Sequence, residues 1–425
     1  MSGLAKYLLH LGKCVGGSDI ASNEYTEELM DYGIKIDFEN FSDKIENYDV
    51  IIFTDAISDE NLRLRKARSL SKLTMPRGEF LYEVSLNFDK VIAVSGCHGK
   101  TTCCAMLAHI FDCAGKKFAS HIGGKDVALS NFYYCGSEYF ITEACEYKKN
   151  FLHLKPDVAV ILNSDADHLE CYGSESEVKS TYINFSASAK KTIVLYKDLP
   201  QASGISFGFD KSADYFASDI KINNGIYAFT IYEYGKKLGD IFLKVYGKHN
   251  ILNALASTAV ARHFGIDFEQ ICAGLNSFTG VERRFERLAE IRGISYIADY
   301  AHHPNELRAS LKTVRKITRG KVLVIFQPHT YSRTKLLFNE FIKVLSPLPN
   351  LLLYKTFAAR EYYDDAGSAL TLSQSIKRAS YGDCPKDIKD FIARAEEGDS
   401  VIFLGAGDIY FIAKQICNQL RGDND

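Results

Sequence analysis

The chain has 425 residues, with 51 lysines and arginines against 53 aspartates and glutamates and a formal net charge of −2. A single hydrophobic core stops growing near ~250–300 residues, so this length predicts two or three domains. The near-neutral charge argues against a broad basic surface for nucleic acid, and no apolar run reaches the ~18–20 residues that a bilayer span needs. We therefore expect neither nucleic-acid binding nor membrane insertion.

Eleven cysteines are scattered along the chain, an odd number that includes no Cys-x-x-Cys pair. This usage favours reduced thiols in the cytoplasm over a disulfide framework or a zinc ribbon. The N-terminal apolar run is short and is not followed by a small-residue cleavage site, so it does not resemble a secretory signal peptide. A cytoplasmic location is the expectation.

Short apolar runs rich in valine and isoleucine alternate with helical patterns along most of the chain. Each run has four to six residues and is followed by a turn and a polar or amphipathic stretch. The runs cover residues 49–54, 90–95, 158–162, 192–195, 321–326, 350–354 and 400–404. This pattern is typical of buried parallel strands joined by crossover helices, so the predicted fold class is α/β.

Residues 225–247 differ, because they alternate, turn over 234–239 and alternate again, which predicts an antiparallel hairpin. Residues 250–264 then predict a helix that Gly265 caps. Residues 77–88 show no strong period, and residues 278–288 are turn-like and charged. We place domain boundaries near these segments, which predicts domains at 1–86, 87–287 and 288–425.

The strongest motif follows the run at 90–95 and opens a helix predicted to end near residue 114. It reads Ser95-Gly96-Cys97-His98-Gly99-Lys100-Thr101-Thr102. Strand, glycine turn, Lys-Thr and helix form the context of a phosphate-binding loop, although Val94 stands where such loops have their first glycine. Backbone N–H groups would face the phosphates, Lys100 would reach the β- and γ-phosphates, and the Thr101 hydroxyl would ligate Mg²⁺. An incidental glycine turn is the alternative.

Acidic groups follow two further apolar runs. Glu143-Ala144-Cys145-Glu146 comes after the run at 139–142, and Asn163-Ser164-Asp165-Ala166-Asp167-His168 comes after the run at 158–162. The carboxyl ends of buried parallel strands face the ligand crevice of such a sheet, and carboxylates are hard ligands that suit Mg²⁺. A solvated loop carboxylate and a structural histidine are the alternatives.

Four more segments combine polar groups with a helix start or a strand end. They are Gly247–Asn253 (GKHNILN), Gly280–Phe285 (GVERRF), Asp299–Glu306 (DYAHHPNE) and Gln327–Lys335 (QPHTYSRTK). Asn250 and Asn253 share one helix face and could bracket an adenine edge, but taken alone Asn250 is better read as a helix cap. For the other three segments, a structural turn or charge cluster and a site are equally supported.

Taken in order, these strings resemble the Mur ligase family over nearly the whole chain, and in particular its alanine-adding, Gram-positive branch. The resemblance implies a Rossmann-like N-terminal domain for a UDP-sugar, a central P-loop ATPase domain and a C-terminal Rossmann-like α/β domain. It implies that ATP phosphorylates the lactyl carboxylate of UDP-N-acetylmuramate, and that the amine of L-alanine attacks the acyl phosphate. It also implies two Mg²⁺ sites at which Mn²⁺ can substitute, in a monomer or weak homodimer.

The resemblance further implies roles for single residues. Thr101, Glu143 and His168 would hold metal, and Asn250, Asn253 and the neighbouring His249 would contact the nucleotide. Arg284 would reach the nucleotide phosphates, Asp299 and Tyr300 the ribose, and His302 and His303 the substrate. Arg333 would lie near the acyl phosphate or the amino-acid carboxylate, and Lys100, His302, His303 and Arg333 are the predicted catalytic residues.

The chain also departs from the family's pattern. Thr330 and Lys335 stand where many relatives have arginine, so carboxylate recognition would rest on Arg333. Cys97 replaces the usual threonine, and Tyr182 stands where other branches carry a carbamoylated lysine. Met1–Ala5 matches only the end of the family's glycine-rich N-terminal motif, so we expect the true start upstream, which the in-frame upstream DNA would decide.

Two other interpretations remain open at this point. A murein-peptide recycling ligase would share the loop and the AHHP string but would add an intact peptide. A truncated paralogue would bind its ligands without catalytic activity.

Overall fold

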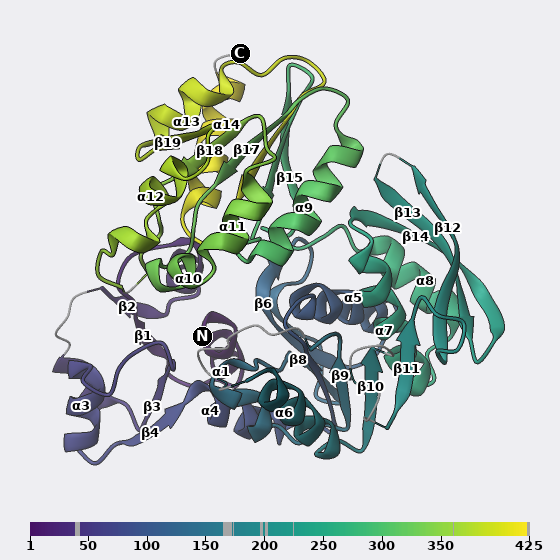
Figure 1. Cartoon of the computed structure of the whole chain (residues 1–425). Helices are drawn as coiled ribbons and strands as arrows, with labels where there is room; N and C mark the ends of the chain where they lie inside the picture. The colour runs from purple at the N-terminus through teal and green to yellow at the C-terminus, as the bar shows by residue number, and fades with distance from the viewer. Residues whose placement is uncertain are drawn as a thin grey trace. The chain divides into compact units, whose positions relative to one another are not determined.

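The computed structural model describes residues 1–38, 43–164, 172, 174–195, 199, 203–223, 225–359 and 361–422. The chain divides into two compact units, which Figure 1 labels by element. The first unit comprises Met1–Ile220, Ala228–Leu243 and His249–Thr279, and the second comprises Lys221–Tyr227, Lys244–Lys248 and Gly280–Asp425. Both units contain sheets rich in parallel strands with packed helices, which confirms the predicted α/β class.

The N-terminal part of the first unit contains two small parallel sheets. β1 (Gly16–Ser18) pairs with β2 (Lys35–Asp37), and β3 (Val50–Phe53) pairs with β4 (Leu73–Pro76). The helices here are α1 (Ser2–His10), α2 (Glu24–Asp31), α3 (Leu62–Ser69) and α4 (Arg77–Ser85). Residues 77–88 show no strong period in the sequence, yet most of them form α4. The helix buries Leu81 and Val84 in the unit's core, so tertiary packing compensates for the weak local pattern.

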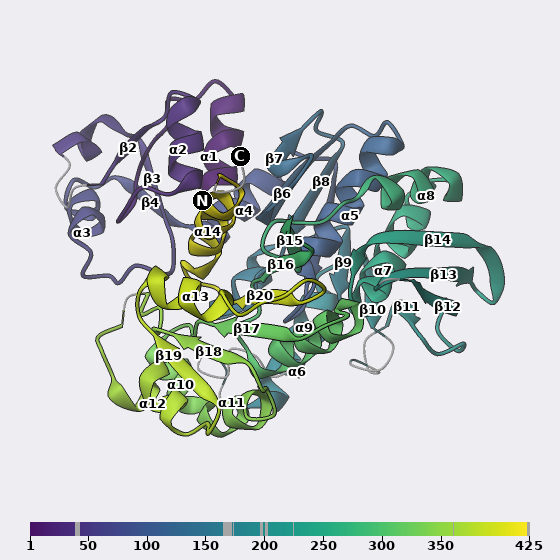
Figure 2. The same cartoon turned by 90° about the horizontal axis from the view of Figure 1, so that it is seen from above.

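Among the described residues, a ten-stranded sheet runs through the first unit in the order β14-β13-β12-β11-β10-β9-β5-β8-β6-β7 (Figure 2). The strands are β5 (Lys90–Ser95), β6 (Phe118–Asp126), β7 (Ser130–Tyr134), β8 (Tyr139–Glu143), β9 (Val158–Ile161), β10 (Lys191–Leu195), β11 (Ile205–Gly208), β12 (Tyr215–Asn223), β13 (Ile226–Glu233) and β14 (Lys236–Tyr246). The central strands pair in parallel, as their continuous apolar runs predicted. The sequence pattern did not predict the antiparallel pair β6–β7.

The predicted hairpin is present as β13 and β14. Its turn is shorter than predicted, because only Tyr234 and Gly235 connect the two strands. Both residues have positive φ, 47° and 76°, as a two-residue turn between antiparallel strands requires. The predicted helix at 250–264 is α7 (His249–His263), and Gly265 follows it with a φ of 71°.

Helix α5 (Lys100–Cys113) is buried on nearly all sides, between the sheet and the pair α7 and α8 (Phe268–Ser277). Its apolar residues face both neighbours, as expected of a helix enclosed in an α/β core. The packing of α8 on α5 depends on Gly274, where an added Cβ would lie 2.4 Å from the Ile110 Cα. A further helix described in this unit is α6 (Glu175–Ala187).

Replacing Gly274 by alanine is expected to lower stability by about 1–3 kcal/mol, because the two helix backbones must separate. Helix propensity alone predicts the opposite sign, a gain of about 1 kcal/mol. Urea or thermal unfolding of Gly274→Ala measures which effect wins. Gly422→Ala is the matched control, since nothing lies within 4 Å of an added Cβ at the end of α14. Stabilisation by both substitutions would contradict the packing argument.

In its described residues, the second unit has a six-stranded sheet in the order β15-β16-β20-β17-β18-β19. The strands are β15 (Glu286–Ile291), β16 (Ile294–Asp299), β17 (Val322–Phe326), β18 (Leu351–Tyr354), β19 (Ala379–Gly382) and β20 (Ser400–Leu404). All neighbours pair in parallel except β15 and β16. The sequence pattern did not predict β15, which begins inside the segment 278–288 that we interpreted as turn-like.

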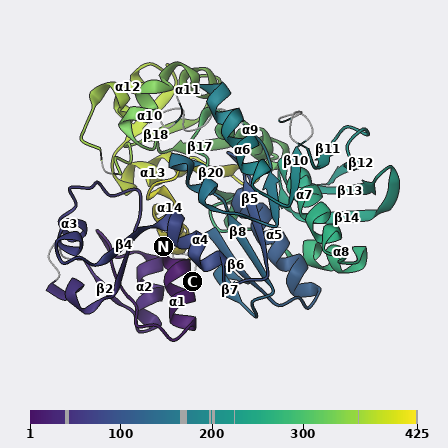
Figure 3. The ribbon, with the colours of Figure 1, turned by 90° about the horizontal axis from the view of Figure 1, so that it is seen from below.

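Helices cover both faces of this sheet (Figure 3). They are α9 (Pro304–Ile317), α10 (Tyr331–Leu336), α11 (Phe338–Leu345), α12 (Ala369–Gln374), α13 (Pro385–Ile392) and α14 (Ile409–Gly422). Alternate strand residues feed two cores: Val324 and Ile402 pack with α9, α11 and α12, whereas Leu323 and Val401 pack with α13 and α14. Two buried faces explain the uninterrupted apolar runs in these strands.

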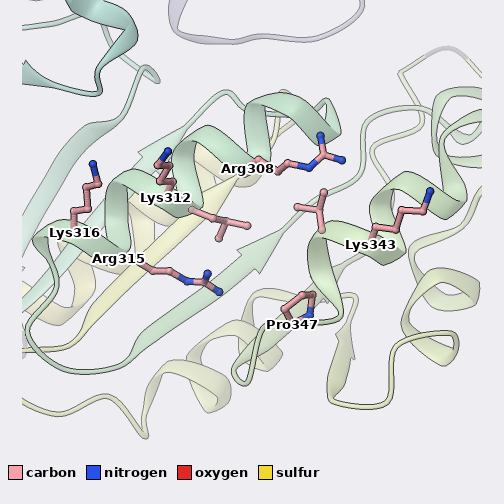
Figure 4. Close-up of a pocket in the computed structure, with 8 residues that line it drawn as sticks. Arg308, Lys312, Arg315, Lys316, Lys343 and Pro347 are labelled. Atoms are coloured by element: carbon pink, nitrogen blue, oxygen red, sulfur yellow. The ribbon is translucent and has the colours of Figure 1, made fainter.

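A groove in the second unit runs between α9 and α11 (Figure 4). Its floor is apolar, and its rim is basic. The lining residues are Arg308, Leu311, Lys312, Arg315, Lys316, Lys343, Val344 and Pro347. None of the residues predicted to act in a site lines this groove. In the described parts of the chain, no helix combines the length and apolar character that a membrane crossing requires.

Candidate active site

The strand order of the first unit gathers three predicted motifs at one sheet edge. β5 lies between β9 and β8, and all three strands run parallel. Val94 pairs with Glu143 on one side, and Ser95 pairs with Ile161 on the other. The loop that follows β5 is therefore flanked by the polar residues that follow its two neighbours. This is the crevice at the carboxyl ends of the strands, where open α/β sheets bind ligands.

The loop between β5 and α5 has the conformation that its glycines predict. Gly96 and Gly99 have φ values of 134° and 87°, and an added Cβ on Gly99 would lie 2.7 Å from the Asn253 Oδ1. Asn163 fastens the loop from β9's end: its Oδ1 accepts a hydrogen bond from the His98 N–H at 3.0 Å, and its Nδ2 donates to the His98 carbonyl at 2.9 Å. Asn163 was not among the predicted site residues, although it belongs to a quoted motif.

Lys100 is the first residue of α5, and its side chain bends back over the loop. The Nζ lies 2.9 Å from the Glu146 carboxylate and 2.5 Å from the Gly96 carbonyl oxygen, to which it donates. The two charged side chains are 15% and 3% exposed. Burial alone would lower the pKa of Lys100, but the adjacent Glu146, with Cys145 and Glu143, outweighs burial and raises the pKa above its ordinary value. Lys100 is therefore a firmly charged cation at the mouth of the loop.

Oxygen atoms that could ligate a metal ion lie in the residues around this loop. Thr101 is buried in the first turn of α5, and Glu143 ends β8 with its Oε1 accepting the Gly123 N–H at 2.5 Å. The buried Ser95 hydroxyl has no hydrogen-bond partner among the described residues. A hydroxyl and a carboxylate at one sheet edge fit a hard divalent cation such as Mg²⁺. The other predicted ligand, His168, lies outside the described residues, as do Asp165 and Asp167.

Two amide side chains adjoin the loop from α7. The Asn253 Nδ2 donates to the Asn250 Oδ1 at 2.9 Å, and both side chains are buried. Asn250 is the second residue of α7, inside its first turn, so the interpretation of Asn250 as a cap is wrong. The predicted His249, the first residue of α7, is exposed. Elsewhere at the loop, the Cys97 Sγ lies 3.7 Å from the Tyr182 hydroxyl.

The predicted residues of the second unit gather at the carboxyl ends of its strands. Asp299 ends β16 and accepts hydrogen bonds from the Phe285 N–H at 3.3 Å and from the Ser310 hydroxyl. Burial raises the pKa of the Asp299 carboxyl, although the Ser310 hydrogen bond opposes this. Tyr300 follows, with the Arg284 guanidinium 4.9 Å from its ring centre. Asp299 thus holds the segment that carries Arg284.

The two predicted histidines differ in their surroundings. The backbone N–H groups of His302 and His303 both donate to the Glu306 Oε2, at 3.0 and 3.1 Å. His303 also accepts the Asn305 N–H on its Nδ1 at 3.3 Å, so it caps α9. The His302 ring instead lies 5.9 Å from the His329 ring, centre to centre. Of the two histidines, His302 is therefore the one whose ring lies beside another titratable side chain, that of His329.

Two residues of this cluster were missed in the sequence. His329 follows β17, stacks on Phe357 and has a buried Nδ1 without a hydrogen-bond partner among the described residues. Arg283 donates to the Gly407 carbonyl at 2.7 Å, and its guanidinium lies 4.9 Å from the Tyr300 ring centre, as does that of Arg284. Both residues belong to polar segments that the sequence indicates as candidate sites. Which residue of each segment lies in the cluster depends on the tertiary structure.

Arg333 lies in α10, and its N–H bonds the Thr330 Oγ1 at 3.4 Å. The neighbouring Lys335 pairs with Asp364 at 3.0 Å and is exposed. The role of Arg333 in carboxylate binding stays a prediction.

The stability of the second unit is expected to fall as the pH drops from about 6.5 towards about 4. Burial, with nearby His302 and Arg333, lowers the pKa of His329 to about 4. In this window the unfolded chain takes up a proton on His329 and the folded chain does not, so protonation favours unfolding. Urea unfolding at pH 7.5 and pH 5 should show a smaller loss for His329→Gln than for the wild type. Equal losses would contradict the assignment.

Comparison with known proteins finds matches along nearly the whole chain. Models of the "Mur ligase family, catalytic domain", the "Mur ligase middle domain" and the "Mur ligase, glutamate ligase domain" match residues 1–89, 94–261 and 283–407. The UDP-N-acetylmuramate–L-alanine ligase of Clostridium beijerinckii is 37% identical over 98% of this chain and 94% of its own. That of Acetivibrio thermocellus is 36% identical over 97% and 92%.

Solved structures show the same relationship. The UDP-N-acetylmuramate–alanine ligase MurC from Thermotoga maritima has a TM-score of 0.86 at 27% identity, covering 100% of this chain and 97% of its own. A murein peptide ligase from Psychrobacter arcticus, with a TM-score of 0.77 at 22% identity over 99% and 96%, shares the fold. The chain belongs to the Mur ligase family. The predicted three-domain organisation is confirmed, while the boundaries near residues 86 and 287 stay predictions.

Proposed function

We propose that the chain is an ATP-dependent ligase that joins L-alanine to the lactyl carboxylate of UDP-N-acetylmuramate, in the cytoplasmic synthesis of peptidoglycan precursors. The observation that carries this proposal is the loop after β5, where the Lys100 ammonium bends back to the Gly96 carbonyl and Asn163 holds His98. The names of two relatives support L-alanine as the amino acid, since both are UDP-N-acetylmuramate–L-alanine ligases.

The residues of the first unit suit phosphoryl transfer from ATP. Backbone N–H groups of residues 96–99 and the charge of Lys100 would bind the phosphates, and Asn250 and Asn253 would receive the adenine. Thr101 and Glu143, with His168, would hold Mg²⁺, which would neutralise charge on the phosphates when bound. No side chain has to act as a nucleophile, because the substrate carboxylate attacks the γ-phosphate. The protein contributes positioning and charge.

The residues of the second unit suit the later step. Arg333 would bind an anionic group, either the acyl phosphate or the carboxylate of L-alanine, through paired hydrogen bonds. His302 would contact the substrate, and Arg284 and Tyr300 would contact the nucleotide. The amine of L-alanine then attacks the acyl carbon, and the tetrahedral intermediate releases phosphate to leave the amide.

Phosphate release tests the proposal directly. Release from ATP should require both UDP-N-acetylmuramate and L-alanine. Activity with a tripeptide in place of L-alanine would instead indicate a recycling ligase, and no release with either acceptor would indicate an inactive paralogue. Omission of Mg²⁺ should abolish release, and Mn²⁺ should restore it.

A further inference from the structure

Glu146 is a buried carboxylate in the segment that follows β8, and the function proposed above gives it no role. It directly follows Cys145, between β8 and the short 3₁₀ segment Tyr147–His153. Its side chain is 3% exposed, and its backbone carbonyl accepts a hydrogen bond from the Tyr172 hydroxyl at 2.5 Å. Glu146 is therefore held through both its backbone and its side chain, and its carboxylate lies 2.9 Å from the Lys100 Nζ.

The N–H groups of the Lys100 ammonium are directed at oxygen atoms of the protein itself. Besides Glu146, it donates to the Gly96 carbonyl at 2.5 Å and lies 3.4 Å from the Cys97 carbonyl oxygen. A phosphate bound in the loop needs the same ammonium, so these contacts compete with it. Glu146 is the strongest competitor, because it alone carries a full negative charge.

We propose that Glu146 is a positioning residue that holds Lys100 as its counter-ion before nucleotide binds and opposes the entry of phosphates that carry no metal. The inference rests on the proposed function, because it takes the loop to be the nucleotide phosphate site. Binding then exchanges the Glu146 carboxylate for phosphate oxygens at Lys100. A bare nucleotide meets a buried negative charge at that point, whereas a metal on the phosphates removes much of the repulsion.

This role predicts opposite signs for binding and catalysis. Glu146→Gln keeps the shape and removes the charge, so metal-free ADP should bind about tenfold more tightly. Turnover should fall, because Lys100 loses the partner that orients it. A purely structural ion pair predicts a different pattern, in which loss of Glu146 loosens the loop and weakens both.

The test is a fluorescence titration of the full chain with N-methylanthraniloyl-ADP in EDTA at fixed ionic strength. Glu177→Gln is the matched control, since Glu177 forms a lysine–glutamate pair with Lys149 at 2.7 Å on the same unit, with about 40% of each side chain exposed. Tighter binding by Glu146→Gln alone supports the inference. Unchanged or weaker binding overturns it. A parallel titration with Mg²⁺ in place of EDTA tests the loop assignment separately, and absence of ADP binding by the wild type under that condition would overturn it.

A second comparison covers the case in which Glu146→Gln fails to fold around an unpaired lysine. Lys100→Met and Lys100→Met/Glu146→Gln differ only in the carboxylate, and the double variant buries neither charge alone. The double variant should bind metal-free ADP more tightly than Lys100→Met. Equal affinities would show that Glu146 does not oppose phosphate, which overturns the inference.

Discussion

Replacing Lys100 by alanine is expected to lower turnover by about 10²–10³-fold or more, the largest effect of any single substitution considered. The transferring phosphoryl group spreads negative charge over its oxygens, and Lys100 is the buried cation at the loop that would offset it. Single-turnover phosphate release with saturating UDP-N-acetylmuramate and L-alanine measures the effect on the chemical step rather than on binding.

The control for Lys100→Ala is Lys149→Ala, which removes a lysine from an exposed ion pair of the same unit. Circular dichroism and thermal unfolding should show that both variants fold, since Lys100→Ala leaves Glu146 without its cation. Near-normal turnover of a folded Lys100→Ala would contradict the assignment of the loop to ATP. Rescue of binding but not of turnover by Lys100→Arg would agree with a role in positioning.

Replacing Asp126 by alanine is expected to cost about 3 kcal/mol or more of stability, the largest structural effect. Asp126 is buried at the end of β6, and its Oδ1 accepts the Ala128 and Leu129 N–H groups at 2.9 and 2.8 Å. It also faces the His109 Nε2 of α5 at 3.1 Å. Alanine would leave three polar groups without this acceptor: the buried His109 ring nitrogen and the two backbone N–H groups of the turn after β6. A buried polar group that loses its partner bears its full desolvation cost.

Urea unfolding measures this loss, with Asp112→Ala as the control. Asp112 is exposed on α5, and its Oδ1 accepts a hydrogen bond from the Tyr133 hydroxyl at 3.2 Å, so its removal should change stability by less than about 1 kcal/mol. Asp126→Asn should lie between the two, because it keeps one oxygen acceptor. Equal stabilities of Asp126→Ala and Asp112→Ala would show that the His109 network contributes little.

The elements that could be predicted are those with a strong local signal. Residues 90–95 and 400–404 match β5 and β20 residue for residue, because strands buried on both faces leave an unbroken apolar run. The elements that were missed have weak signals. β6 contains Gly123 and Gly124, and α4 has no clear period, so only the partners that bury them make them regular.

The site divides in the same way. The sequence identifies the phosphate loop, since a strand, glycines, Lys-Thr and a helix are adjacent in the chain. It cannot identify Asn163 as the residue that fastens His98, because they are separated by 65 positions and meet only through the pairing of β5 with β9. Likewise, only the fold shows that His303 caps α9 while His329 lies beside His302.

The sequence by itself thus determined the α/β class, the central strands and the residue types available for phosphate chemistry, because these depend on local pattern. The tertiary structure alone decided which of those residues meet, as with Glu146 and Lys100, 46 positions apart in the chain. The physical reason is that strand order brings distant segments to one sheet edge. There, burial turns an ordinary carboxylate and ammonium into a strongly interacting pair.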